Sequence, residues 1–327
     1  MKRRSLRVMT RDPLRSMPQS VTETHFWTPR VLVPFLLVSL IWGSTWLVIR
    51  DQIAVVPPSW SITYRFIVGA AAMFVLVRAR GLPFSLGRDG QILAILLGVS
   101  QFICNFNFVY RAEHFITSGL VAVIFALLII PNALLSAVFL GQRIATAFII
   151  GSLVAIAGVA ALFANEYNMG DFAGNGFWSG IGFALLGVLS ASVANVMQGS
   201  RAVQRWPIIS MLAWAMLWGA IGNAAIAFAI SGPPVIEPRF TYWLGIFYLG
   251  IVASAVTFPL YFGLIRVIGP GRAAYSSVIV PITAMMLSTI FEDYRWTNLA
   301  IVGAALGLVG LLIAMWARTP RTPRLPG

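Results

Sequence analysis

Residues 119–131 read GLVAVIFALLIIP and residues 269–281 read GPGRAAYSSVIVP, and each stretch opens on a glycine and closes on a proline. The correspondence continues downstream, where Gln142 and Glu292 stand at equal distances from these prolines. Further pairs extend it: Leu97-Gly98 with Leu249-Gly250, Gly151 with Gly303, and Gly158 with Gly310. The sequence therefore contains one structural unit twice.

The composition places both copies of this unit in a lipid bilayer. The chain is 59% hydrophobic and only 10% charged, with a mean hydropathy of +0.85, whereas soluble domains carry about 25% charged residues. A helix that crosses the hydrocarbon core needs roughly 20 mostly apolar residues. Ten segments have this character: 32–49, 59–77, 91–110, 116–140, 144–163, 177–198, 207–230, 241–265, 273–291 and 297–316.

Each copy contains five predicted spans, and because five is odd, the second copy must lie inverted in the membrane. We predict an all-α integral membrane protein with ten transmembrane helices as two inverted five-helix repeats, at 31–164 and 177–317. Tails at 1–30 and 318–327 flank the repeats, and no connection has room for a soluble catalytic domain. Inverted repeats are the usual construction of secondary transporters, with the substrate site between the repeats near mid-bilayer.

The net charge of +13 arises from an uneven distribution of basic residues. With the N-terminus in the cytoplasm, the cytoplasmic side of the ten predicted spans holds 18 Lys and Arg residues. The outer side holds four: Arg50, Arg111, Arg239 and Arg295. Because Lys and Arg accumulate in cytoplasmic loops, we predict a multi-pass protein of the cytoplasmic (inner) membrane with both termini inside. The basic excess is then a topology signal and does not predict a nucleic-acid partner.

Several short motifs resemble those of one transporter family. The first span contains Trp42-Gly43-Ser44-Thr45-Trp46, and the second runs from Pro57-Pro58-Ser59-Trp60 to Tyr64-Arg65-Phe66. Together with the duplication, these resemble the EamA-type family of the drug/metabolite transporter superfamily over residues 32–316. The resemblance implies a ten-helix exporter or exchanger of small metabolites with cytoplasmic termini. Where the family often has Glu, this chain has Gln142, while the second copy keeps Glu292.

Arg65 is the most informative candidate for the substrate site. It lies about six residues into its predicted span, roughly 9 Å deep at 1.5 Å per residue, and ionisable residues inside spans are rare and usually face a cavity or a partner. Arg65 is either a cation that anchors substrate or forms part of a gate, or a side chain that reaches back to the outer interface or holds a neighbouring helix through its carbonyls. Both interpretations stay open at this point.

The other candidates are polar and aromatic side chains in the middle or near the ends of spans. They are Trp42, Ser44, Thr45, Asn105, Tyr110, Asn195, Trp214 and Tyr261. For each, lining a polar cavity competes with ordinary helix packing, and Trp214 suits either a cavity wall or a lipid-facing position. Apolar pockets with few polar groups suit small amphipathic or aromatic molecules, so we expect an amino-acid-like substrate.

The sequence offers little for catalysis or metal binding. His25 and His114 are isolated, and Cys104 is the single cysteine, so we expect no metal site, no cofactor and no enzymatic activity. The favoured function is secondary transport by alternating access, as export or exchange, by a monomer or a homodimer in contact with membrane lipid. The alternative is an integral membrane enzyme or a non-transporting partner subunit, which would predict a cluster of ionisable residues that the sequence lacks.

Overall fold

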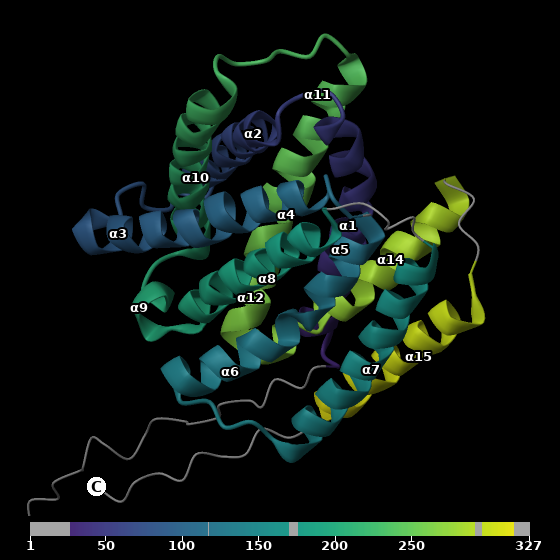
Figure 1. The fold of residues 1–327 in the computed structure, drawn as a ribbon. Helices are drawn as coiled ribbons and strands as arrows, with labels where there is room; N and C mark the ends of the chain where they lie inside the picture. The colour runs from purple at the N-terminus through teal and green to yellow at the C-terminus, as the bar shows by residue number, and fades with distance from the viewer. Residues whose placement is uncertain (1–26, 117, 170–175, 292–295, 317–327) are drawn as a thin grey trace, which may run out of the picture.

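The computed structural model describes residues 27–116, 118–169, 176–291 and 296–316, and these form helices without a β-strand (Figure 1). The helices of the first half are α1 Pro29–Ile53, α2 Pro58–Ala79, α3 Gly87–Leu97, η1 Gly98–Asn105, α4 Phe106–Ala112, α5 Ser118–Phe125, η2 Ala126–Leu128, α6 Ile129–Leu140 and α7 Thr146–Met169. Those of the second half are α8 Phe177–Gly199, α9 Arg201–Gln204, α10 Ile208–Ser231, α11 Phe240–Phe247, η3 Tyr248–Val256, α12 Thr257–Ile268, α13 Pro270–Ala273, α14 Ser276–Phe291 and α15 Asn298–Trp316.

Eight helices of the described chain are long and apolar enough to cross a membrane. They are Pro29–Ile53, Pro58–Ala79, Gly87–Ala112, Gly119–Leu140, Thr146–Asn165, Phe177–Gly199, Ile208–Ser231 and Phe240–Ile268. The other two predicted spans, 273–291 and 297–316, fall on α14, which has 16 residues, and on a shorter apolar helix at Asn298–Ala314. All eight coincide with predicted spans, because a chain in lipid must satisfy its backbone hydrogen bonds within each helix.

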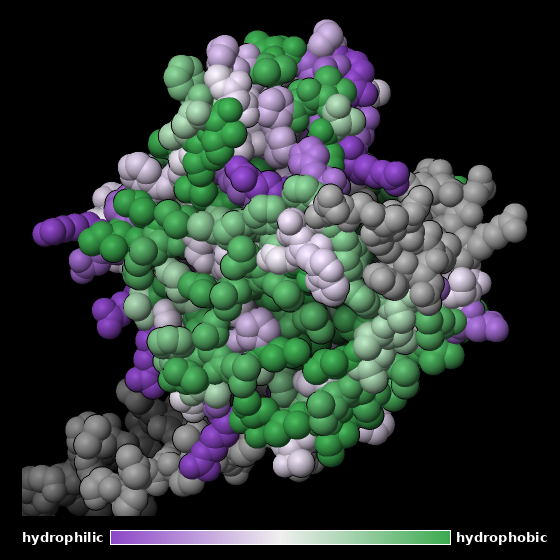
Figure 2. Space-filling view, viewed as in Figure 1, coloured by the Kyte–Doolittle hydropathy of each residue, from purple (hydrophilic) through white to green (hydrophobic). Residues whose placement is uncertain are grey.

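The outer surface of the helices is apolar, as a lipid-facing surface requires. Figure 2 shows a mostly hydrophobic face, with hydrophilic residues gathered towards the top of the view and at its left edge. Large apolar side chains are strongly exposed on several helices, including Val138 on α6, Leu153 on α7 and Trp178 on α8. Outside a bilayer such a surface would aggregate, since exposed apolar patches of this extent mark sites of association or membrane contact.

The two ends of the bundle differ in their charged residues: one, the arginine-rich end, holds mainly arginines, and the other, which we call the acidic end, holds Asp51, Glu113 and Glu237 beside three arginines. At the arginine-rich end, Gly199 at the end of α8 lies against Leu140 and Pro270, and Arg266 donates to the carbonyl of Trp206. At the acidic end, Asp51 at the end of α1 pairs with Arg239, which precedes α11. Helix α6 ends at the arginine-rich end in a tight turn, in which Gly141 adopts the left-handed conformation (φ 62°).

Helices α7 and α15 pack backbone to backbone through five glycines. A Cβ atom placed on Gly158 would lie 2.5 Å from the amide nitrogen of Gly307, and one on Gly310 would lie 2.5 Å from the carbonyl oxygen of Gly151. A Cβ on Gly303 would meet the Gly158 carbonyl at 2.9 Å. Small residues allow such close approach in membranes, so this pair joins the end of the first half to the end of the second.

Two helices contain a widened π-helical segment at corresponding places. Segment η1 begins at Leu97-Gly98 and η3 contains Leu249-Gly250, the dipeptides that echo each other in the sequence. Helix α10 crosses η1 at Gly98, and helix α2 crosses η3 at Gly250. Segments of π-helix are frequently found at functional sites, and both of these face the interior of the bundle.

Candidate functional site

Arg65 on α2 lies in the interior of the bundle, where it faces α4 and η3. Arg65 is only 2% exposed, and its Nε donates a hydrogen bond of 3.1 Å to Ser254 Oγ. The guanidinium carbon lies 4.5 Å from the ring centroid of Phe106 and 5.5 Å from that of Phe66. Contacts of this kind with aromatic faces attract a cation. The side chain thus points inward and does not reach back to the interface.

The guanidinium of Arg65 is only partly satisfied. Its Nη1 has no hydrogen-bond partner among the described residues, and no described carboxylate forms an ion pair with it. The hydroxyl of Tyr110 lies close enough to the guanidinium to interact with it, and it has no other partner among the described residues. Because a buried charge without a counterion is costly, this group is poised to accept an anion.

Ser254 is brought to Arg65 by the π-helical segment η3. Its hydroxyl donates back to the carbonyl of Leu249, five residues earlier, at 2.7 Å, and accepts the hydrogen bond from Arg65. The wider turn of a π-helix is what brings these two residues into register. Sequence reasoning missed Ser254, because a lone serine between Ala253 and Ala255 carries no signal of its own.

Trp42 and the rings that it contacts form an aromatic layer next to Arg65 and Ser254. Its indole Nε1 donates to the carbonyl of Ala253 at 3.2 Å, the residue before the partner of Arg65. Its ring centroid lies 5.4 Å from that of Phe258 and 4.8 Å from that of Tyr261. Edge and tilted ring contacts of this kind are favourable. The predicted residues Trp42 and Tyr261 therefore lie together.

The neighbours of Trp42 on α1 differ in their roles. The hydroxyls of Ser44 and Tyr248 are hydrogen-bonded at 2.5 Å, which links α1 to η3. Thr45 is buried and its hydroxyl donates to the carbonyl of Trp42, three residues earlier, at 2.7 Å. Ser44 thus contacts Tyr248, which in turn lies near Arg65. The hydroxyl of Thr45 is bonded within its own helix.

Asn105 and its neighbour Asn107 are both buried but differ in bonding. The side-chain oxygen of Asn105 has no partner. Asn107 accepts from Ser59 at 2.9 Å and donates to Asn223 at 2.5 Å, which ties α2, α4 and α10 together. Asn107 is therefore a structural connector, whereas Asn105 keeps a free acceptor in the interior.

Asn195 and Tyr261 meet in a second polar layer, closer to the arginine-rich end. Asn195 Nδ2 donates to the Tyr261 hydroxyl at 3.2 Å and approaches Asn132 Oδ1 at 3.5 Å. Asn132 Nδ2 in turn donates to the carbonyl of Pro270 at 3.1 Å. All three side chains are buried. Asn132 was not among the predicted residues, and its position before a long apolar stretch gave no indication of this contact.

Trp214 does not join either layer. Its indole donates to the carbonyl of Phe84 at 2.7 Å, in the connection between α2 and α3. Its ring packs edge-on against Phe74, with centroids 5.3 Å apart. This residue therefore lies at the arginine-rich periphery, away from Trp42 and Arg65.

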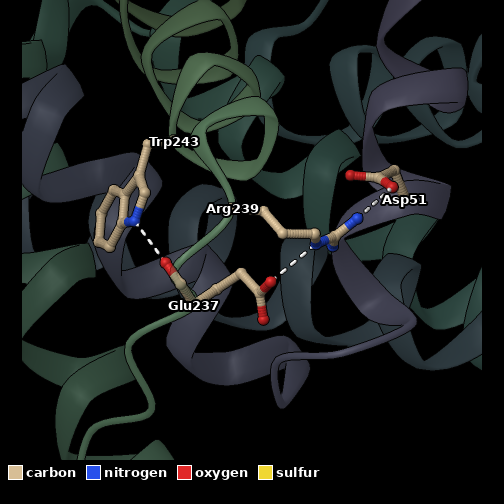
Figure 3. A network of polar contacts seen from close by, with 4 residues as sticks. All are labelled: Asp51, Glu237, Arg239 and Trp243. Atoms are coloured by element: carbon tan, nitrogen blue, oxygen red, sulfur yellow. Dashed lines mark hydrogen bonds and ion pairs between the residues drawn. The ribbon is translucent and has the colours of Figure 1, made fainter.

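The acidic end carries a small ionic network, drawn in Figure 3. Arg239 pairs with Asp51 at 3.2 Å and with Glu237 at 2.7 Å, and Trp243 donates to the carbonyl of Glu237 at 2.8 Å. The Arg239 and Asp51 side chains are largely exposed, so this pair is screened by solvent. It connects the end of α1 to the connection that precedes α11.

These features define a class of protein: a multi-pass helical membrane protein whose interior holds a buried cation, amides and aromatic rings, as solute transporters do. A family model described as the EamA-like transporter family matches residues 30–164 and 178–316, and the chain belongs to this family. The expectation from the sequence motifs is thereby confirmed.

Curated relatives span almost the whole chain. Protein PagO of Salmonella typhimurium is 24% identical over 297 residues, which cover 90% of this chain and 96% of that protein. The uncharacterized inner membrane transporter YedA of Escherichia coli K12 is 28% identical over 282 residues, covering 83% and 88%. A probable amino-acid metabolite efflux pump of E. coli K12 is 25% identical over 287 residues, covering 85% and 92%. The family and the last two names denote transporters, which are not enzymes.

A solved crystal structure has the same fold. It superposes with a TM-score of 0.72 at 20% sequence identity, covering 86% of this chain and 95% of that one. At this identity the likeness concerns the fold alone. The helical arrangement is thus one already seen by experiment.

Proposed function

We propose that this protein is a secondary transporter that moves a small amino-acid-like or amphipathic metabolite across the cytoplasmic membrane by alternating access. It acts as an exporter or an exchanger, as a monomer or a homodimer, with both termini in the cytoplasm. The proposal includes α14 and α15 as the ninth and tenth spans of two inverted five-helix repeats. Support for the repeats comes from the two matches of the family model and from the corresponding crossings at Gly98 and Gly250.

The observation that carries the proposal is the unpaired Nη1 of the buried Arg65. A carboxylate would accept charge-assisted hydrogen bonds from this guanidinium and would neutralise the only arginine buried among these aromatic rings. A polyanion would call for several cations, which the described interior around Arg65 does not offer. The substrate is therefore expected to carry a single carboxylate.

The apolar part of the substrate is expected to lie against the aromatic rings around Arg65. Phe106 and Phe66 face the guanidinium, and Trp42 and Phe258 follow towards the arginine-rich end. Ligand sites are typically apolar with a few placed polar groups, which matches this combination. The name of the E. coli amino-acid metabolite efflux pump supports a substrate of this kind.

The test is transport by purified protein in proteoliposomes, with radiolabelled L-glutamine and L-leucine and unlabelled substrate on the opposite side. Loss of a hydrogen bond to a charged group costs about 1.5–3 kcal/mol, so Arg65→Ala is expected to lower uptake by roughly ten- to a hundredfold. Arg65→Lys keeps the charge without the forked geometry and is expected to retain part of the activity.

Arg80→Ala is the matched control, because Arg80 is exposed at the end of α2 and outside the site. It should transport at the wild-type rate. Wild-type transport by Arg65→Ala at equal reconstitution would show that the buried arginine is a packing element and that the proposed site is wrong.

A further inference from the structure

The π-helical segment η3 releases a backbone carbonyl at its end. In a regular α-helix each carbonyl accepts from the amide four residues later, which for Ala253 is the amide of Thr257. That amide is bonded instead to the carbonyls of Val252 and Ser254. The carbonyl of Ala253 accepts from the indole Nε1 of Trp42 on α1, at 3.2 Å. A side chain of another helix thus takes the place of a helical hydrogen bond.

The segment η1 repeats this arrangement with a different donor. The amide of Phe106 would bond to the carbonyl of Phe102 in a regular α-helix, but it is bonded to that of Ile103. The carbonyl of Phe102 accepts from Nδ2 of Asn223 on α10, at 2.8 Å. Helix α10 comes close enough for this bond because Gly219, one turn earlier, lies against Phe102.

Both of these hydrogen bonds join the two halves of the chain. Trp42 belongs to the first half and bonds to η3 in the second, whereas Asn223 belongs to the second half and bonds to η1 in the first. A buried backbone carbonyl needs a partner, and irregular helices in membranes persist where neighbouring helices supply one. Movement of one half against the other at these contacts would therefore break the two bonds.

Each of the two carbonyls also has a second possible partner, in its own helix. If the side chain withdraws, the amide of Thr257 can return to the carbonyl of Ala253, and that of Phe106 to the carbonyl of Phe102. The segment then becomes α-helical, with fewer residues in the turn. The part of the helix beyond the segment turns relative to the part before it. Each segment can therefore adopt two discrete arrangements, as conformational switching requires.

The form of η3 also determines the contact of Arg65 with Ser254. The hydroxyl of Ser254 donates to the carbonyl of Leu249, five residues earlier, and accepts from Arg65 Nε. A separation of five residues matches the turn of a π-helix. Conversion of η3 to an α-helix would change the direction of the Ser254 side chain and release the guanidinium from it.

We propose that η1 and η3 are the hinges of the transport cycle, and that Asn223 and Trp42 hold them in the π-helical form. Loss of either side-chain bond allows the segment to convert and the bundle to open at one of its ends. This inference rests on the alternating access of the proposed function and specifies where the helices change shape.

Asn223→Leu is the variant to test first, because Trp42 also belongs to the proposed substrate site. Two reporter cysteines are introduced singly in a background without Cys104: Gln52→Cys at the acidic end and Gln198→Cys near the end of α8. Both positions are 0% exposed, so N-ethylmaleimide should react slowly with them in wild-type protein in lipid nanodiscs. Loss of one hydrogen bond shifts an equilibrium roughly two- to tenfold. Asn223→Leu should accelerate labelling of at least one reporter by this factor.

A third reporter and a control variant separate hinge movement from loosened packing. Leu162→Cys on α7 is a buried position against Gly303 of α15, and its labelling should stay slow in Asn223→Leu. Ser59→Ala removes the hydrogen bond of Ser59 to Asn107, which neighbours Asn223, without removing a bond to either released carbonyl. Its labelling should match the wild type. Equal acceleration of all three reporters, or the same acceleration in Ser59→Ala, would overturn the inference.

Trp42→Phe tests the second hinge and replaces the first test if Asn223→Leu fails to fold. It removes the indole N–H from the carbonyl of Ala253 and keeps an aromatic ring against Phe258 and Tyr261. The expected result is again faster labelling of Gln52→Cys or Gln198→Cys. Wild-type labelling rates in this variant would show that η3 is not held by Trp42 and would overturn the inference.

Failure of this inference is distinguishable from failure of the proposed function, because the labelling needs no substrate. If the wild-type protein transports L-glutamine or L-leucine while both variants label like the wild type, the hinges are wrong and the transport function stands. If the variants label faster but the wild-type protein transports neither amino acid, the helices convert as inferred and the proposed substrate class is wrong.

Discussion

The carbonyl oxygen of Arg65 lies against Gly250 in the same way as the carbonyl oxygen of Ala215 lies against Gly98. A Cβ on Gly250 would come within 2.9 Å of the first oxygen, and a Cβ on Gly98 within 2.7 Å of the second. The two helix crossings therefore correspond, yet one carries a buried guanidinium and the other a methyl group. The two crossings thus match in backbone geometry but differ in chemistry, since only the crossing at Gly250 carries a charged side chain.

Gly250→Ala is expected to displace Arg65. The new methyl group would meet the Arg65 carbonyl and the Val68 side chain, and backbone atoms cannot rotate away as side chains do. Overpacking of this kind costs about 1–3 kcal/mol, so the thermal midpoint in detergent should fall and transport should weaken.

Gly263→Ala is the control for this substitution, since a Cβ on Gly263 has no neighbour within 4 Å. It should be neutral or slightly stabilising, because alanine is the better helix former by about 0.5–1 kcal/mol. Equal midpoints for the Gly250 and Gly263 variants would show that the crossing of α2 and η3 tolerates a methyl group.

Trp42→Ala should cut transport, whereas Trp214→Ala should not. Trp42 contacts Phe258 and Tyr261 in the interior, while Trp214 is bonded to Phe84 at the periphery. Both variants remove one indole and its hydrogen bond, so they are closely matched in chemistry. Proteoliposome uptake at equal reconstitution provides the measurement, and equal activities would contradict the role given to Trp42.

Glu113 should make stability depend on pH. Its carboxyl follows α4, both oxygens are buried without a hydrogen-bond partner, and burial raises its pKa well above the usual value, with Arg50 acting weakly against this. The folded state therefore holds the proton more tightly than the unfolded state. Its contribution to stability is fully present below the unfolded pKa of about 4.3 and is lost as pH rises through the raised pKa of the folded protein.

Glu113→Gln imitates the protonated carboxyl and should remove this dependence. Thermal midpoints of the two proteins in detergent should agree at acidic pH, with the wild-type value falling below that of the variant as pH rises. Parallel curves over the whole range would show that the pKa of Glu113 does not differ between the folded and the unfolded state.

Transport is expected to proceed without a proton carrier at mid-membrane. The described acidic residues, Asp51, Asp89, Glu113, Glu166 and Glu237, all lie near helix ends or in connections, whereas proton relays use ionisable groups inside the membrane. A pH gradient imposed on proteoliposomes should not drive accumulation of L-glutamine. Accumulation that disappears in Glu113→Gln would assign proton coupling to the acidic end.

The topology can be tested with two single-cysteine variants in a background without Cys104. Ile236→Cys lies in the exposed connection before α11 at the acidic end, and Ser85→Cys lies in the exposed connection before α3 at the arginine-rich end. With cytoplasmic termini, an impermeant thiol reagent should label the first from outside the cell. The second should react only after permeabilisation, and the opposite pattern would reverse the orientation.

The sequence was sufficient to predict eight of the membrane-spanning helices and to single out Arg65, because both depend on local signals. An apolar run of sufficient length must form a helix in lipid, and a single arginine within such a run stands out. The partner of Arg65 could not be found in this way, since Ser254 lies 189 residues away in the sequence and reaches Arg65 only through a π-helical segment. Which face of α10 turns inward was equally hidden, because a helix that is apolar on all sides gives no periodic signal.

The close packing of α7 and α15 limits how the two halves can move. Where glycine meets glycine, no side chain can change its rotamer to absorb a displacement, so a larger residue brought into this contact would push the two helices apart. In the proposed alternating-access cycle, this pair would stay packed while other helices move. In that cycle, the glycines between α7 and α15 would belong to the part of the bundle that does not move.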